Sequence, residues 1–396
     1  MSHEWDNYSE LFEWDDYKNH EQSILLKQRP IAINLIIMDL MHRMAIRLFY
    51  NRNEGALLKL ILSLLWLLSV FYGLVVRLRL LLYKKNLLSS RSIPARVLCV
   101  GNITVGGTGK TPLVMTIARF LAEKGKKVGI VSRGYSRKTH GSFIVSSGEG
   151  ALLGVEEAGD EAFLMAQKLS GIPVAVGEDR HSACSLLLKY QALDAIILDD
   201  GFSHLSLKRN LDILMFKAGR GIGNGHLLPR GPLREPLKGI KRASACVIVG
   251  RDIELQSFIN RLNPHARIFE AQYRLTGFRS ARDGQLMSLM EMRKAKLFAF
   301  CGIADPDSFF STLMAENLNI CGKVAYPDHY WYTEEDLNNM SLMKENARAD
   351  FAVTTEKDYA RFARRIPLER LPLLVAECDL SVEESFKDFI LSCMKG

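Results

Sequence analysis

The sequence predicts an α/β fold, with a parallel sheet that carries helices on both faces. A second, smaller α/β domain and an amino-terminal membrane helix complete the expected architecture. From Ala95 onward, short β-branched runs alternate with helical stretches, which is the pattern of parallel α/β proteins. One of these runs leads into a glycine-rich loop that ends in Lys110-Thr111, and an uncharged apolar run at residues 60–76 precedes them all.

The individual elements follow from hydrophobic period and from turn residues. In the first series, the predicted strands are residues 96–100, 128–132, 173–176, 195–198, 211–216 and 246–249, and the predicted helices are 111–124, 160–169 and 180–190. In the second series, the predicted strands are residues 296–301, 351–354 and 373–377, with a helix near 307–316. The periodicity is weaker between the two series. We therefore expect a core domain at 91–250, a linker region at 251–295 and a carboxy-terminal α/β domain at 296–396.

The composition is that of a folded protein. A chain of 396 residues with 48% hydrophobic and 24% charged residues can form two domains with full cores. The formal net charge of +8 favours an acidic partner, for which nucleic acid, phosphate and anionic lipid all qualify. The seven cysteines lack CxxC spacing, which indicates small buried residues in a reducing compartment rather than a disulfide framework or a zinc site.

The apolar run at residues 60–76 is the candidate membrane segment. Seventeen residues at helical rise span about 25 Å, the short end of what a bilayer core requires. The basic residues that follow are Arg77, Arg79, Lys84, Lys85, Arg91 and Arg96. This excess of positive charge after the apolar run would hold the chain that follows it in the cytoplasm. A spanning helix, a helix lying in the interface and a buried core helix remain open, and we expect residues 31–90 to form a membrane-associated helical segment.

Residues 1–30 form an acidic amino-terminal extension. Acidic side chains greatly outnumber basic ones in its first 21 residues, and tryptophan and tyrosine lie among them. A partner-binding tail, a mobile extension and an upstream start that is not used remain open.

The glycine-rich loop predicts a phosphate-binding site of the P-loop NTPase type. The chain reads Val-Gly-Asn-Ile-Thr-Val-Gly-Gly-Thr-Gly-Lys-Thr over residues 100–111. Glycines let backbone N–H groups turn toward phosphate oxygens at a helix amino terminus, while Lys110 would reach the β- and γ-phosphates and Thr111 would bind Mg²⁺. The residues expected to bind nucleotide here are Thr104, Val105, Gly106, Gly107, Thr108, Gly109, Lys110 and Thr111. Thr104 stands where the usual pattern has its first glycine, and a glycine-rich turn without a ligand is the alternative.

A second acidic element would hold the metal. The apolar strand at 195–198 ends in Asp199-Asp200-Gly201. A carboxylate at a strand end binds Mg²⁺ in many P-loop proteins, directly or through water. An Asp-Gly pair after a strand is also ordinary turn chemistry. The P-loop upstream favours the metal site, and we expect Asp199 and Asp200 to be metal ligands.

These motifs, in this order, resemble the tetraacyldisaccharide 4′-kinase family of the lipid A pathway in Gram-negative bacteria. The matching segments are the apolar helix ending FYGLVVRLRLLLY, and then VGNITVGGTGKTP, SRGYSRK, GDEAFLMA, VGEDR, DDGFSHLSLKRNLDI, LLPRGPLREP, CGIADPDSFF, YPDHYWY and TTEKD. They cover residues 57–365. Ala162, Ser203 and Asn210 depart from the family pattern, where proline, glutamine and aspartate stand.

The resemblance implies a kinase with ATP and Mg²⁺ as cofactors. It would transfer the ATP γ-phosphoryl group to the 4′-hydroxyl of a tetraacylated glucosamine disaccharide 1-phosphate. The reaction would take place on the cytoplasmic face of the bacterial inner membrane, with membrane lipids as partners and the apolar helix as the attachment. The resemblance also implies two α/β domains joined by a short β-ribbon, with residues 91–250 as the P-loop kinase core.

The same resemblance assigns further site residues. Asp160 of the GDE segment and His329 of the PDH segment would be catalytic together with Lys110. Arg180 and Arg234 would bind the phosphates, and Glu161 and Glu235 would lie at the metal. A carboxylate such as Asp160 could accept the proton of a sugar hydroxyl, and His329 could orient it or carry the proton onward. Alternatively, Asp160 caps its helix and His329 is structural.

Two other classes of protein remain as alternatives. A membrane-anchored P-loop ATPase or GTPase switch would turn over nucleotide without a sugar-lipid acceptor, although no NKxD guanine motif is present. A nucleic-acid-binding module would fit the positive charge. However, the basic residues cluster after the apolar run, where lipid headgroups would lie, so we expect no nucleic-acid partner.

Overall fold

The structure, a computed structural model, describes residues 56–363 and 371–394. The expected acidic extension at 1–30 and the part of the membrane-associated segment before residue 56 lie outside the described residues. The described strands form one 13-stranded sheet in the order β11-β10-β12-β13-β8-β7-β6-β1-β5-β2-β4-β3, with β9 paired to β8. The predicted α/β fold is confirmed, including the P-loop sheet and the apolar amino-terminal helix.

The first half of the sheet is parallel except at its edge, where β3 runs antiparallel to β4. Its strands are β1 (Arg96–Gly101), β2 (Val128–Ser132), β3 (Phe143–Ser146), β4 (Val174–Val176), β5 (Ala195–Asp199), β6 (Leu211–Lys217) and β7 (Ala245–Val249). Its helices are α3 (Lys110–Glu123), α4 (Val155–Ala158), α5 (Asp160–Lys168), α6 (Arg180–Tyr190), the 3₁₀ helix η2 (Leu237–Arg242) and α7 (Ile253–Leu262).

Alternate residues of β1 enter two separate cores. Leu98 and Val100 belong to a cluster with α3 and α5, whereas Val97 and Cys99 belong to a cluster with α6, α7 and η2. Successive strand side chains point to opposite faces, so helices cover both faces of this half of the sheet. The last helix, α12 (Glu384–Met394), adds Phe386 to the α3 cluster.

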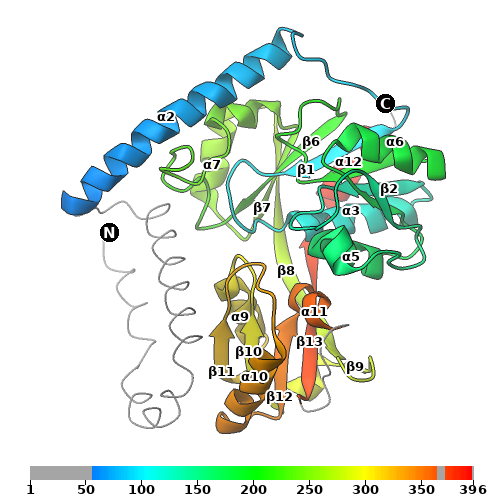
Figure 1. The fold of residues 1–396 in the computed structure, drawn as a ribbon, viewed down its shortest axis with the longest axis vertical. Helices are drawn as coiled ribbons and strands as arrows, with labels where there is room; N and C mark the ends of the chain where they lie inside the picture. The colour runs from blue at the N-terminus through cyan, green and yellow to red at the C-terminus, as the bar shows by residue number, and fades with distance from the viewer. Residues whose placement is uncertain (1–55, 364–370, 395–396) are drawn as a thin grey trace. The chain divides into compact units, whose positions relative to one another are not determined.

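The second half of the sheet continues from the first through one long antiparallel pair. Its elements are β8 (Arg267–Ser280), β9 (Leu286–Met287), α8 (Leu289–Met292), β10 (Lys296–Cys301), α9 (Pro306–Ala315), β11 (Asn319–Ala325), α10 (Glu334–Asn346), β12 (Phe351–Thr355), α11 (Glu356–Phe362) and β13 (Leu373–Val382). Strand β8 is parallel to β7 and antiparallel to β13, and both long strands run from one half to the other (Figure 1). The region expected to be a linker, 251–295, thus contains α7 and β8, and the division into domains stays a prediction.

Helix α2 (Ala56–Lys84) has few buried residues among its described side chains, and these form one stripe. Leu62, Ser69 and Gly73 are buried on this stripe, and their spacing of seven and four residues, with Tyr72 beside them, places them on one helix face. The stretch Leu62–Lys84 is long and apolar enough to cross a membrane, with a mean hydropathy of 1.9, and most of it is exposed. This exposure contradicts the buried core helix and agrees with membrane association.

Candidate active site

The P-loop lies between the end of β1 and the start of α3. Gly106 (φ 103°) and Gly109 (φ 82°) have left-handed backbone conformations that favour glycine. Thr104 instead forms an antiparallel bridge with Leu233, and paired extended backbone tolerates any residue, which explains the departure from the usual first glycine. The Val105 amide donates to the Pro232 carbonyl at 2.8 Å, so this N–H already has an acceptor.

Arg234 connects the P-loop to the end of β5. Its Nε donates to the Thr104 carbonyl at 3.1 Å, and its Nη1 donates to Asp200 at 3.0 Å. Its Nη2 contacts the side-chain oxygen of Asn102. Lys110 Nζ lies 3.9 Å from the same Asp200 carboxylate. Burial would raise the pKa of Asp200, but the charges of Lys110 and Arg234 hold it below its usual value.

The Asp199 carboxylate has the character of a cation ligand. It is buried, and its Oδ2 accepts from Ser132 at 3.3 Å and from Thr111 at 3.5 Å, while its Oδ1 has no hydrogen-bond partner. Burial raises the pKa of Asp199 to about 7, and the nearby charges of Glu161 and Asp200 add to this effect. An orphaned carboxylate oxygen beside a threonine hydroxyl fits Mg²⁺, which typically takes one or two carboxylates and substrate phosphates as ligands.

Among the described residues, no group of three or more His, Cys, Asp or Glu side chains could hold a metal ion without further ligands.

Two other expected site residues, Arg180 and Glu235, have protein partners. Arg180 is buried, with Nη1 donating to the Gly177 carbonyl at 2.8 Å. Its pKa is lowered by burial, although the charges of Asp200 and Asp199 oppose this. Glu235 accepts from Arg242 at 2.7 Å. The phosphate role of Arg180 and the metal role of Glu235 stay predictions.

Asp160 and His329 come from the two halves of the chain and are in contact. Asp160 is the first residue of α5, and its Oδ2 lies 2.9 Å from His329 Nδ1. His329 has a left-handed backbone (φ 60°) and packs its ring on Tyr135, with centroids 5.0 Å apart. Both residues line a small pocket together with Trp331. The structure therefore brings together, across 169 positions, the pair that the family resemblance implied.

Two residues of α11 that the sequence analysis did not assign complete this cluster. Arg361 donates to Asp160 Oδ2 from Nη2 (2.7 Å) and Nε (3.2 Å), and its Nη1 donates to Asp358 (3.0 Å). Lys357 Nζ lies 3.2 Å from Glu161 and 3.7 Å from Asp160. Burial would raise the pKa of Asp160, but the His329 hydrogen bond, Lys357 and Arg361 hold it well below its usual value. The TTEKD segment was a signal for Lys357 and Asp358; Arg361 lies one helical turn later.

Replacing Arg361 with methionine is expected to lower the free energy of unfolding by about 3–5 kcal/mol, the usual cost of breaking a buried ion pair. Asp160 and Asp358 would both lose their buried cation. Urea denaturation would measure the change. Arg119→Met is the matched control, because the pair of Arg119 with Asp379 (3.0 Å) is 35% and 50% exposed and its loss should cost less than about 1 kcal/mol. Equal, small losses in both variants would contradict the buried pairing.

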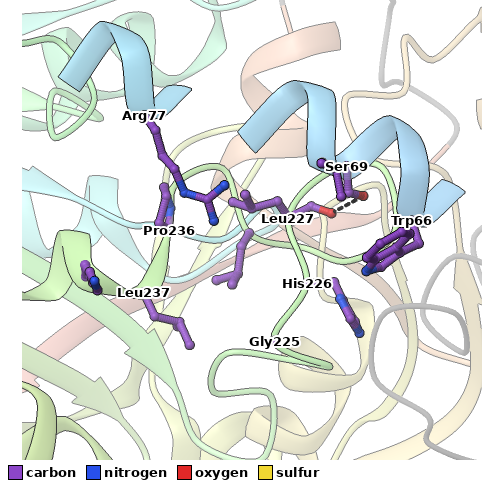
Figure 2. Close-up of a pocket in the computed structure, with 11 residues that line it drawn as sticks. Trp66, Ser69, Arg77, Gly225, His226, Leu227, Pro236 and Leu237 are labelled. Carbon is purple, nitrogen blue, oxygen red and sulfur yellow. Dashed lines mark hydrogen bonds between the residues drawn. The ribbon is translucent and has the colours of Figure 1, made fainter. Parts of the chain in front are cut away.

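A larger cavity lies between α2 and the loop that leads to Arg234. Its volume is about 400 Å³. Figure 2 shows Trp66, Ser69 and Arg77 of α2 on one side, and the 225–227 loop with Pro236 and Leu237 on the other. The lining combines apolar side chains with the cations Arg77 and Lys238.

Glu161 relates the two clusters, because it pairs with Lys357 at 3.2 Å and its charge contributes to the raised pKa of Asp199. A nucleotide switch has no use for an Asp–His pair supplied from two halves of a chain, whereas transfer to an acceptor hydroxyl can use such a pair to accept the hydroxyl proton. The fold and this arrangement define a phosphotransferase of the P-loop class.

Comparison with known proteins narrows this class. The family model of tetraacyldisaccharide-1-P 4′-kinase matches residues 61–395. Proteins named tetraacyldisaccharide 4′-kinase are 37% identical over 324 residues in Halothermothrix orenii (77% of this chain, 84% of that protein) and 37% identical over 342 residues in Geobacter sulfurreducens (85% and 96%). The crystal structure of the "apo" form of LpxK from Aquifex aeolicus in complex with ATP superposes with a TM-score of 0.68 at 30% identity, covering 84% of this chain and 99% of that one.

The chain belongs to the tetraacyldisaccharide-1-P 4′-kinase family. The predicted family and the predicted enzyme class, a kinase, are confirmed, and a nucleotide switch without an acceptor is not favoured.

Proposed function

We propose that the protein transfers the γ-phosphoryl group of ATP to the 4′-hydroxyl of tetraacyldisaccharide 1-phosphate. Relatives in Halothermothrix orenii and Geobacter sulfurreducens are named for this activity, and the Aquifex aeolicus relative binds ATP. The observation that supports the proposal most is the 2.9 Å contact between Asp160 and His329. It would provide a site for the acceptor hydroxyl, and the charge of the neighbouring Glu161 acts on the strand-end carboxylate Asp199, which would lie at the phosphates.

Positive charge would be supplied from several directions. Lys110 and the P-loop amides would hold the β- and γ-phosphates, with Arg234 and Arg180 close to the strand-end carboxylates. Phosphoryl transfer depends mainly on such positioning and neutralisation of charge. Mg²⁺, held by Thr111 and Asp199 with Asp200 and Glu161 nearby, would add positive charge at the phosphate oxygens.

His329 would accept the proton of the hydroxyl. The Asp160 carboxylate receives four hydrogen bonds, from His329, twice from Arg361 and from the Glu161 amide, and its lowered pKa makes it a weak base. An anionic Asp160 requires the proton of the neutral imidazole to be on Nδ1, which leaves the Nε2 lone pair free to accept. As the 4′-oxygen forms its bond to the γ-phosphorus, ADP leaves and the hydroxyl proton passes to Nε2.

Helix α2 would lie in the membrane interface rather than span the bilayer. Its docked stripe, which includes Ser69 and Gly73, is at the middle of the helix. Because the middle of α2 packs on the core, it could reach the bilayer centre only if the core entered the bilayer with it. The opposite face exposes Leu64, Phe71 and Leu78 and suits an interfacial helix. The basic residues after residue 76 favour the cytoplasmic face. The cavity beside α2 would receive the substrate from the membrane.

Changing Leu64, Phe71 and Leu78 together to glutamate should release the protein from membranes. Each side chain is more than half exposed, and the spacing of seven residues places them on one face of α2. Losing three apolar side chains that would be buried in the membrane should weaken vesicle binding by at least about 10²-fold. Sedimentation with phosphatidylglycerol-containing vesicles would measure this. Leu286→Glu with Met290→Glu, equally exposed on β9 and α8, is the control and should bind normally.

The activity is tested by incubating the protein with ATP, Mg²⁺ and tetraacyldisaccharide 1-phosphate in detergent micelles. The 1,4′-bisphosphorylated product should form, together with one ADP for each product. The 4′-deoxy acceptor is the matched control and should give neither. ATP turnover that is identical with and without acceptor, and gives no bisphosphate, would contradict the proposal.

A further inference from the structure

Two hydroxyl groups of helix α2 form hydrogen bonds with a loop of the core, residues 227–234. Ser69 Oγ lies 2.9 Å from the Leu227 carbonyl oxygen and accepts the Arg230 N–H at 2.9 Å. Tyr72 donates its hydroxyl proton to the carbonyl of Arg234 at 2.8 Å. Gly73 permits this close approach, because a side chain there would lie 2.7 Å from Leu227 Cδ1. All three α2 residues lie on the docked stripe, away from the exposed apolar face.

The segment that receives these hydroxyls is bound on its other side to the P-loop. The Arg234 amide donates to the Ile103 carbonyl at 2.7 Å, and the Val105 amide donates to Pro232 at 2.8 Å. Leu233 forms the bridge with Thr104. The backbone of Arg234 is therefore held between α2 and the P-loop: its N–H is bound to the loop, and its carbonyl is bound to Tyr72.

The side chain of Arg234 transmits this placement to the site. Its guanidinium reaches the Thr104 carbonyl and the Asp200 carboxylate, and Asp200 also faces Lys110. A displacement of about 1 Å at such a group can cost about 10²-fold in rate. Tyr72 does not line the α2 cavity, so its hydroxyl acts on the protein rather than on a ligand held there.

We propose that Tyr72 is a positioning residue for phosphoryl transfer. Its hydroxyl fixes Arg234 against the P-loop, and this makes α2 a structural part of the nucleotide site in addition to its contact with the membrane. The proposal rests on the kinase activity proposed above. It assigns a different role to each face of α2: the docked stripe positions Arg234 at the nucleotide site, and the exposed stripe contacts the bilayer.

Tyr72→Phe removes only the hydroxyl and tests this role. We expect kcat to fall about 10-fold and the KM for ATP to rise, because Arg234 acts at the nucleotide site. The KM for the acylated acceptor and the binding to vesicles should change less than about twofold. Tyr83→Phe is the matched control on the same helix, because the Tyr83 ring contacts Arg79 and its hydroxyl bonds to no described residue. It should behave as the wild type.

A double-mutant cycle with Arg234→Ala identifies the route of the effect, because alanine leaves no cation for Tyr72 to position. If Tyr72 acts through the Arg234 side chain, the double variant should be no slower than Arg234→Ala alone, because coupled residues are non-additive. The proposal would be overturned if the losses of kcat in the two single variants multiplied in the double variant. It would also be overturned if Tyr72→Phe kept a kcat within twofold of the wild type, or if its loss were confined to the KM for the acceptor or to vesicle binding. A wild-type protein that forms no bisphosphate would instead refute the proposed function on which it rests.

Discussion

Replacing Lys110 with alanine is expected to lower the rate of phosphoryl transfer by about 10²–10³-fold, the usual loss when one preorganised electrostatic contact is removed. Lys110 is the first residue of α3, and its ammonium group faces Asp200 at the strand end. Alanine is the best helix former, and the Lys110 side chain is outside the hydrophobic clusters, so the fold should persist. Initial rates at saturating ATP and acceptor would measure the loss.

The control for Lys110→Ala is Lys126→Ala, which removes an exposed lysine just beyond the other end of α3 and should leave the rate unchanged. Thr111→Ala adds a second measurement. Its hydroxyl lies 3.5 Å from Asp199, so this variant should need a higher Mg²⁺ concentration to reach half its maximal rate. Near-normal rates in Lys110→Ala at every ATP concentration would mean that this loop is not the ATP site.

The regular elements could be predicted from the sequence because their period is local. The strand expected at 128–132 is β2, with the same bounds, and the helix expected at 180–190 is α6. The strand expected at 373–377 continues to Val382 as β13. The residue pattern did not predict strand β8, although the family resemblance implied a β-ribbon between the domains, because the burial pattern of β8 changes along its 14 residues as it passes from the core into the antiparallel pair with β13. Its weak period is the consequence of two environments in one strand.

The local motifs predicted the P-loop and the strand-end carboxylates, but not the groups that hold Asp160. Arg361 lies 201 positions from Asp160, and no spacing rule relates the two. Similarly, the apolar run predicted membrane contact without identifying its docked stripe. The run contains four serine, tyrosine or glycine residues, Ser63, Ser69, Tyr72 and Gly73. The spacing of three and four residues that relates Ser69 to Tyr72 and Gly73 was the signal for a protein-facing side, although Ser63 is exposed.

The largest loss of activity is expected for His329→Ala, at about 10²–10⁴-fold, which is the usual contribution of a general base. The ATP site should remain intact, because Lys110 and the glycine loop do not contact His329. Added imidazole should restore part of the activity of this variant, since it can occupy the space of the missing ring and accept the proton. Pre-steady-state product formation with saturating ATP would measure the transfer step itself.

Asp160→Asn separates the two assignments of the proton acceptor. Asparagine keeps the size of the side chain and one oxygen to accept from His329 and Arg361, but it removes the charge that fixes the proton on Nδ1. If His329 is the acceptor, Asp160→Asn should lose about 10²-fold, should not respond to imidazole, and should add little to the defect of His329→Ala in the double variant. If Asp160 is the acceptor, its variant should be the slower one and imidazole should fail in both. A fully active Asp160→Asn would contradict both assignments and move the search for the base to Asp199 and Asp200.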